Sequence, residues 1–157
     1  MITTILSDFS RVILNPKDKN YKGTLNGLYK KLKQEGKPFN FFDYFEFNED
    51  ILGLYLQIKD KHSINIFTTG TIQNAKEVKQ KLGFIFNNVF TAADYNLDKT
   101  QPEAYEFIAK KLGVDPSQIL YIDDEIKNIE AAKEAGLNTF HYEEFRTLFN
   151  KVKEELS

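Results

Sequence analysis

The chain has 157 residues, with 41% hydrophobic residues, 28% charged residues and a formal net charge of −2. This balance predicts one soluble globular domain with room for a small insertion, and the charge gives no reason to expect nucleic acid as a partner. There is no cysteine, which excludes disulfides, thiolate nucleophiles and zinc–thiolate sites. No stretch approaches the apolar length of a membrane span, and the apolar start lacks a basic leader. We therefore expect a cytoplasmic protein with no membrane partner.

An aspartate follows the first predicted strand. Residues 2–7 are mostly β-branched or apolar and predict a buried strand, and Asp8 comes directly after it. In an open parallel sheet the carboxyl ends of the strands face the ligand crevice, so we expect Asp8 to lie where chemistry happens. Residues 11–14 either continue this strand or form a turn. A helix is predicted over 24–35, where leucines recur at helical spacing, and Gly36 is placed to end it.

The segment 39–47 contains six aromatic residues in nine positions. One interpretation is that they fill a core beneath a small helical layer, and the other is that they form a lid lining a substrate cleft. The first is the commoner fate of such a run, and both can hold together. Asn48 then predicts the N-cap of a helix over about 49–61.

From residue 63 onward, predicted strands alternate with single helices. The strands are expected at 63–68, 87–91, 118–122 and 138–141, and the helices at 72–82, about 102–112, about 125–135 and from 145 to the carboxyl terminus. Short loops join them. This alternation predicts an α/β protein, a three-layer α/β/α sandwich around a parallel sheet of about five strands.

Polar residues end three of these strands and can share one crevice, namely Asp8, Thr68 and the pair Asp123-Asp124. Three carboxylates at one site repel each other unless a cation compensates them, and Mg²⁺ prefers such oxygen ligands. Lys99 lies in a loop between the third and fourth strands, and a lysine and a threonine suit the oxygens of a phosphoryl group. Asp8 is then a candidate nucleophile at phosphorus.

Each residue also has an ordinary structural interpretation. Asp124 could only cap the helix that follows it, and Thr68 and Thr69 could cap the helix that begins near residue 71. Lys99 could be a solvated loop lysine, which is the usual fate of that residue. The agreement of four polar positions with four element boundaries favours the site.

These residues carry a resemblance to a known family. The segments Asp8-Phe9-Ser10, Thr68, Lys99-Thr100-Gln101-Pro102 and 119–124 resemble, in order, the four motifs of the haloacid dehalogenase superfamily, with Thr100 where proline is usual. The resemblance implies a Rossmann-like core formed by residues 1–14 and 49–157. It also implies that residues 15–48 are a small helical cap inserted after the first strand. The family implies Mg²⁺ and usually phosphatase chemistry through an aspartyl-phosphate.

The resemblance also implies a metal-ligand set. Asp8 would be both the nucleophile and a metal ligand, and Ser10 would give its backbone carbonyl to the ion. Asp124 would bind Mg²⁺ directly, and Asp123 would bind through water or as a further ligand. Asn128 would brace that loop, or would simply be an exposed helix residue.

Thr68 and Lys99 would hold the phosphoryl oxygens, and Thr69 joins them as a candidate for substrate binding. Two positions depart from the family. Ser10 stands where a second aspartate normally acts as general acid and base, and a serine hydroxyl can relay a proton but cannot replace a carboxylate near neutral pH. Arg11 stands where glycine is usual, and would contact a substrate anion or point to solvent.

The function implied is a Mg²⁺-dependent hydrolase, a phosphatase acting on a small phosphorylated metabolite, and slow because of Ser10. The alternative is a non-catalytic or regulatory phosphate-binding protein of the same fold. A haloacid dehalogenase proper comes third, because it needs a cationic group near the cap and only Arg11 offers an arginine there. The sequence assigns neither the substrate nor the oligomeric state.

Overall fold

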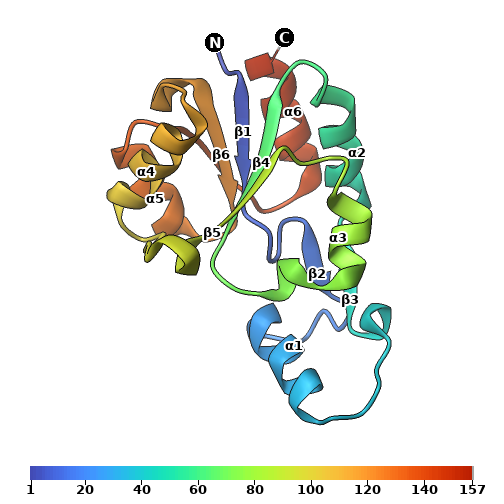
Figure 1. The fold of residues 1–157 in the computed structure, drawn as a ribbon. Coiled ribbons are helices and arrows are strands. Elements are labelled where there is room, and N and C mark those ends of the chain that lie inside the picture. The colour runs from blue at the N-terminus through green and yellow to red at the C-terminus, as the bar shows by residue number, and fades with distance from the viewer. Residues whose placement is uncertain (157) are drawn as a thin grey trace.

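The computed structural model describes residues 1–156 and contains a five-stranded parallel sheet in the order β5-β4-β1-β6-β7 (Figure 1). The strands are β1 (Thr4–Ser7), β4 (Ser63–Thr68), β5 (Asn88–Thr91), β6 (Ile119–Asp123) and β7 (Asn138–His141). Each added strand runs parallel to its neighbour. The prediction of a parallel sheet of about five strands is confirmed.

Helices cover both faces of the sheet, which makes three layers (Figure 1). One face carries α2 (Glu49–Ile58), α3 (Lys76–Leu82) and α6 (Phe145–Leu156), and the other carries α4 (Pro102–Leu112) and α5 (Ile126–Glu134). Successive residues of a strand point to opposite faces, so Ile5 packs in the core under the first group and Leu6 in the core under the second. Both side chains are fully buried.

The central strand aligns the carboxyl ends of its two neighbours. In the register of the sheet, Ser7 pairs with Ile66 of β4 and with Ile122 of β6. The next residue, Asp8, donates its backbone N–H to the carbonyl of Ile122 at 2.8 Å. The polar residues that end β1, β4 and β6 therefore emerge at one edge of the sheet, as the sequence predicts.

Most elements begin and end within two residues of the expected positions, and two helices differ by more. The helix expected over 72–82 is divided into the 3₁₀ turn η2 (Ile72–Asn74) and α3, because Ala75 between them is extended, with ψ 141°. The helix expected over 49–61 ends at Ile58. The chain must turn there so that Ser63 can donate to the carbonyl of Thr3 at 3.1 Å and begin β4. Two further 3₁₀ turns, η3 (Ala92–Tyr95) and η4 (Pro116–Gln118), connect later elements.

A smaller lobe follows the first strand (Figure 1). Its base is an antiparallel ribbon of β2 (Leu14–Pro16) and β3 (Phe45–Phe47), and between these strands lie α1 (Leu25–Gln34) and the 3₁₀ turn η1 (Phe41–Asp43). Residues 11–14 thus form a turn that leads into a new strand. The hydroxyl of Thr24 accepts from the N–H of Gly27 at 3.0 Å and caps α1.

The aromatic run 39–47 is divided between the interior and the surface. Phe41 and Phe45 are buried with ring centroids 4.8 Å apart, and both belong to the same apolar core as Ile5. Phe42 and Tyr44 are exposed. The interpretation of the run as core filling is therefore correct for the two phenylalanines that face inward.

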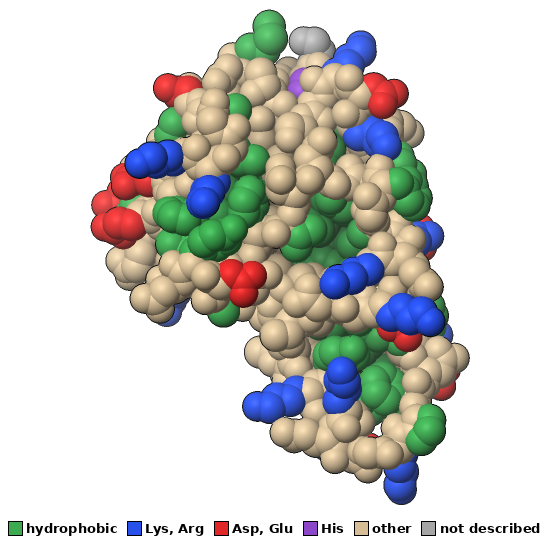
Figure 2. All heavy atoms as spheres, in the orientation of Figure 1, with side chains coloured by type: hydrophobic (Ala, Val, Ile, Leu, Met, Phe, Trp, Pro, Cys, Tyr) green, Lys and Arg blue, Asp and Glu red, His purple; other side chains and the backbone are tan. Residues whose placement is uncertain are grey.

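The smaller lobe carries basic side chains on the face shown in Figure 2, and those of residues 15–48 are lysines, because this segment contains no arginine. Over residues 1–156, no helix combines the length and the apolar character needed to cross a membrane. Large apolar side chains at the surface, such as Phe84, Val89 and Ile126, belong to separate elements or loops of the main lobe. Exposed apolar side chains are common on the surface of a folded chain.

The different burial of Phe41 and Phe42 predicts that their removal will affect the free energy of unfolding very differently. Phe41→Ala removes a side chain that is 2% exposed, and should lower the free energy of unfolding by about 3–5 kcal/mol because it leaves a cavity. Phe42→Ala, the matched control, removes a ring that is 44% exposed and should cost less than about 1 kcal/mol. Urea unfolding of both variants measures the difference. Equal losses would show that Phe41 does not anchor the lobe.

Candidate active site

A cavity of about 320 Å³ opens at the carboxyl ends of β1, β4 and β6. Its walls come from the strand ends, the loop before α4, the start of α5 and the loop that begins α1, and they include Asp8, Ser10, Arg11, Lys22, Gly23, Thr24, Leu25, Asn26, Thr68, Thr69, Lys99, Asp124, Glu125 and Asn128. Every candidate residue predicted from the sequence lines this cavity except Asp123. That residue is fully buried and touches the cavity residue Lys99.

The ammonium group of Lys99 lies at the centre of the site. It is 2.8 Å from Oδ1 of Asp8 and 3.1 Å from Oδ2 of Asp123, and it donates to the carbonyl of Phe67 at 3.0 Å. The residue is only 4% exposed, so it is not a solvated loop lysine. The hydroxyl of Tyr105 donates to the Lys99 carbonyl at 2.7 Å and holds the loop in place. Asp8, Lys99 and Asp123 form a buried charge triad.

Burial and charge set the protonation of this triad. Burial alone would lower the pKa of Lys99, but Asp8 and Asp123 outweigh it and the pKa is raised, so the ammonium stays charged. Burial also raises the pKa of Asp8 to about 6, against the attraction of Lys99. Burial would raise the pKa of Asp123 as well, but Lys99 and hydrogen bonds hold it below its usual value.

Hydrogen bonds occupy both carboxylate oxygens of Asp123. Oδ2 accepts from the Tyr121 hydroxyl and from Nδ2 of Asn128 at 3.0 Å, and Oδ1 accepts from the N–H of Glu125 at 2.8 Å. Asn128 is thus a brace for this loop. With Lys99 as the fourth partner, these bonds fix the position of the Asp123 carboxylate.

Asp124 behaves differently from its neighbour. It does not cap the following helix, because the N-cap position of α5 is Glu125 and no side-chain capping bond is present there. Among residues 1–156, no other residue bonds its carboxylate, while its carbonyl lies 2.8 Å from Nε2 of His141. Burial, followed by the charges of Asp8 and Asp123, raises the pKa of Asp124 to about 7. This carboxylate is available to a ligand.

The carboxylates fit a hard divalent cation. One oxygen from each of Asp8, Asp123 and Asp124 can be chosen so that all lie within 4.8 Å of one another. The single ammonium of Lys99 does not balance three carboxylates, and burial together with the repulsion between carboxylates raises the pKa values of Asp8 and Asp124. An all-oxygen donor set of this size suits Mg²⁺, which would keep some of its waters.

Ser10 and Arg11 lie in the turn after β1. The Ser10 hydroxyl is buried and has no hydrogen-bond partner within residues 1–156. Because Ser10 lines the cavity, this hydroxyl could form a hydrogen bond with a molecule bound there. Arg11 has φ 64°, a left-handed conformation for which glycine is better suited. Its Nη2 donates to the carbonyls of Tyr21 at 3.1 Å and Gly23 at 2.7 Å. The guanidinium thus holds the smaller lobe, a role that neither expectation for Arg11 included.

Thr68 is buried at the end of β4 and Thr69 is exposed after it, and both line the cavity. Neither caps a helix, because η2 and α3 lack side-chain capping bonds at their N-caps. The aromatic run 39–47 contributes no residue to the described cavity walls, so it is not a lid for this cavity. The lobe reaches the site through residues 22–26 instead, which carry no motif that sequence reasoning could detect.

Comparisons with known proteins identify the family of this chain. A family model described as haloacid dehalogenase-like hydrolase matches residues 12–136, most of the chain. The chain therefore belongs to the haloacid dehalogenase-like hydrolase family. The match begins after Asp8, so the placement of that residue rests on its contacts with Lys99.

Curated relatives of this chain are phosphatases. The chain is 30% identical over 76 residues to N-acetylmuramic acid 6-phosphate phosphatase of Pseudomonas aeruginosa, covering 47% of this chain and 34% of that protein. It is 45% identical over 42 residues to enolase-phosphatase E1 of Methylococcus capsulatus, covering 27% and 18%. The chain thus spans about a third or less of these relatives' lengths.

Among solved structures, a HAD family enzyme from Bacteroides thetaiotaomicron in complex with magnesium and inorganic phosphate has a TM-score of 0.70 at 17% identity, covering 95% of this chain and 100% of that one. A predicted HAD-like family hydrolase from Porphyromonas gingivalis has a TM-score of 0.65 at 13% identity, covering 97% and 98%. At such identities the likeness establishes the fold, which is that of the family over nearly the whole chain.

The crowding of carboxylates predicts a response to metal. Saturating Mg²⁺ should raise the melting temperature by about 5 °C or more, and Asp124→Asn should remove the rise, because it removes the negative charge of a cavity carboxylate that no other residue among 1–156 bonds. Glu130→Gln, which changes an exposed acid of α5 outside the described cavity wall, is the control and should respond like the parent. Scanning fluorimetry measures the shift, and a wild-type protein insensitive to Mg²⁺ would exclude the metal site.

The same shift should depend on pH in one direction. Mg²⁺ binds the ionised carboxylates, whereas Asp8 and Asp124 have pKa values of about 6 and about 7 and are protonated below them. Protons then compete with the metal, so the rise in melting temperature should grow as the pH rises through about 7.

Proposed function

We propose that this protein is a Mg²⁺-dependent phosphatase that hydrolyses a small phosphorylated metabolite through an aspartyl-phosphate on Asp8. The observation that carries the proposal is the buried triad of Asp8, Lys99 and Asp123, with the unpaired Asp124 beside it in an open cavity. The names of the curated relatives are consistent with it.

The first step transfers the phosphoryl group to Asp8. A carboxylate oxygen of Asp8 forms a bond to phosphorus while the ester P–O bond breaks, and the leaving oxygen takes up a proton. Lys99 holds Oδ1 of Asp8 at 2.8 Å and thereby fixes the orientation of the nucleophile. Thr68 and Thr69 stand at the end of β4, where they would bind the phosphoryl oxygens together with Lys99.

The second step returns Asp8 to its starting state. Water attacks phosphorus, the bond to the Asp8 oxygen breaks, and inorganic phosphate leaves. Asp8, Asp124 and the Ser10 carbonyl would hold Mg²⁺, with Asp123 binding through water or as a further ligand. The ion would supply positive charge to the phosphoryl oxygens. Asp123 has a second part as the anion that keeps Lys99 charged and in place.

Position 10 limits the proton transfers of both steps. A positioned acid or base typically contributes about 10²–10⁴-fold to the rate, and the Ser10 hydroxyl can only relay a proton. Its buried Oγ has no hydrogen-bond partner among residues 1–156 and would form a hydrogen bond with water or with the substrate. This substitution also supports a second candidate function, a non-catalytic or regulatory phosphate-binding protein built on the same site.

We also propose that residues 15–48 act as a cap that selects the substrate, over a core of residues 1–14 and 49–157. The support is that residues 22–26 of this segment line the cavity above the charged triad, while the rest of the described wall comes from Asp8, Ser10, Arg11 and the later strand ends and helices. A cavity of about 320 Å³ fits a small metabolite.

Removal of the nucleophile tests the proposed activity. Wild-type protein with Mg²⁺ should hydrolyse at least one member of a panel of phosphate monoesters, and Asp8→Asn should lower that rate by about a thousandfold or more. Asp94→Asn, at an exposed aspartate of η3, is the control and should keep full activity. If wild type and Asp8→Asn release phosphate equally, the enzyme assignment fails. Phosphate binding without turnover would favour the regulatory alternative.

Ser10→Asp tests the limitation at position 10. The new carboxyl group should raise turnover by about 10–100-fold on an alkyl phosphate, whose poor leaving group needs protonation, and less on an aryl phosphate. Steady-state kinetics of both proteins on both esters provide the measurement. A wild type that already hydrolyses the alkyl ester rapidly, and that Ser10→Asp slows, would place the acid or base elsewhere.

A further inference from the structure

The backbone after β4 lacks a local helix cap, although it carries the residues proposed to bind phosphate. The 3₁₀ turn η2 begins after Thr71, whose side chain makes no capping bond, so the first N–H groups of this turn have no partner from their own segment. These groups belong to Thr71 and Ile72. Both lie within four residues of Thr68.

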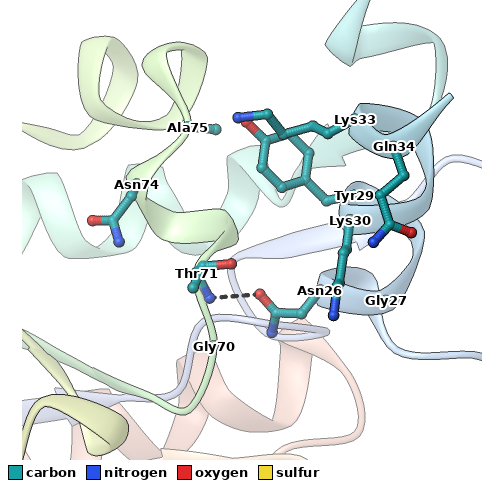
Figure 3. A pocket seen from close by; sticks show the side chains of 10 residues that line it. All are labelled: Asn26, Gly27, Tyr29, Lys30, Lys33, Gln34, Gly70, Thr71, Asn74 and Ala75. Carbon is teal, nitrogen blue, oxygen red and sulfur yellow. Dashed lines mark hydrogen bonds between the residues drawn. The ribbon is translucent and has the colours of Figure 1, made fainter. Parts of the chain in front are cut away.

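A side chain of the smaller lobe supplies the missing partner. Oδ1 of Asn26, near the start of α1, accepts from the N–H of Thr71 at 2.8 Å and from the N–H of Ile72 at 2.8 Å. Figure 3 shows Asn26 reaching from α1 to this turn, at one side of a hollow between the two segments. Asn26 is therefore an N-cap for η2, provided by a residue more than forty positions earlier in the chain.

Gly70 makes this contact possible. A Cβ atom built at Gly70 would lie 2.0 Å from Nδ2 and 2.1 Å from Cγ of Asn26, so any larger residue would displace the Asn26 side chain. The backbone of Gly70 does not have the positive φ that favours glycine. The glycine is needed for the close approach of Asn26 and not for its conformation.

Asn26 also lines the cavity that holds Asp8 and Thr68. Asn26, in the first turn of α1, contacts the turn after β4, and Arg11 contacts the carbonyls of Tyr21 and Gly23 in the loop that leads into this helix. The loop and the start of α1 are thus tied to the backbone segments that follow β1 and β4.

We propose that Asn26 is a positioning residue that fixes the phosphate-binding segment 68–71 and holds the loop 22–26 over the cavity. Its part as an aid to catalysis rests on the proposed function. Its part as a cap for η2 does not, since it follows from hydrogen bonds alone. Loss of the contact should loosen both segments and weaken the binding of phosphate and of phosphate esters.

Four variants separate this contact from its surroundings. Asn26→Ala removes the acceptor, and Gly70→Ala displaces it while leaving Asn26 in the chain. Asn26→Asp keeps acceptor oxygens on the same side-chain length. Asn74→Ala removes an exposed amide group that lines the same hollow but makes no described side-chain bond to the lobe, and it is the matched control.

Amide hydrogen exchange of the metal-free proteins tests the cap. In Asn26→Ala and Gly70→Ala the N–H groups of Thr71 and Ile72 should exchange about tenfold faster than in wild type, while Asn26→Asp and Asn74→Ala should keep protection. The double variant Asn26→Ala/Gly70→Ala should be no worse than either single one, because both act on one contact. Wild-type exchange rates in Asn26→Ala, or additive effects in the double variant, would overturn the assignment.

Binding of inorganic phosphate with Mg²⁺, measured by calorimetry, tests the positioning role without turnover. The dissociation constant should rise by about tenfold in Asn26→Ala and Gly70→Ala and stay within about twofold in Asn74→Ala. Where the wild type hydrolyses an ester, the same variants should raise KM more than they lower kcat. Faster exchange with unchanged phosphate binding would overturn the positioning role, and so would a wild type that binds no phosphate. A wild type that binds phosphate without hydrolysing esters would contradict only the proposed enzyme.

Discussion

The ion pairs of Lys99 are the interaction on which the site depends. Taking an ammonium group out of water is costly unless opposite charges and hydrogen bonds replace its hydration, and Asp8, Asp123 and the Phe67 carbonyl provide both. These contacts require the carboxyl ends of β1, β4 and β6 to lie side by side at one edge of the sheet. The register of β1 with β4 and β6 sets this alignment, and the Tyr105 hydroxyl fixes the loop that carries the lysine.

The two adjacent aspartates show how local hydrogen bonding divides one sequence motif into two chemical roles. Donors surround Asp123, and Lys99 and these hydrogen bonds hold its pKa below the usual value, whereas Asp124 lacks such partners and has a raised pKa. Asp123 helps to keep the Lys99 ammonium charged, and the carboxylate oxygens of Asp124 are available to a ligand. These roles agree with the positions of the two residues, because Asp123 is fully buried and Asp124 lines the cavity.

The main sheet and the charged residues could be predicted because each leaves a local pattern. Buried strands appear as short apolar runs, and a polar residue at the end of each run predicts the site edge, as with Asp8 and Thr68. Contacts between distant segments leave no such pattern. The three-residue strands β2 and β3 are too short for periodicity, and the hydrogen bonds of Asn26 and Arg11 join positions whose types alone name no partner. The break at Ala75 is likewise a backbone property of a residue that favours helices.

The position of β1 in the sheet has a consequence for how the chain folds. This strand precedes β4 and β6 in the sequence but lies between them in the sheet, and Thr4 pairs with Ile119. Its backbone groups on the side of β6 stay unpaired until β6 has been synthesised, and Asp123 can join Asp8 beside Lys99 only then. Pairing of this sequence separation makes folding slow, because a long loop must close before the contacts reward it. The charged centre is therefore assembled late, and a nascent chain truncated before β6 contains Asp8 and Lys99 without Asp123, the second carboxylate beside the ammonium group.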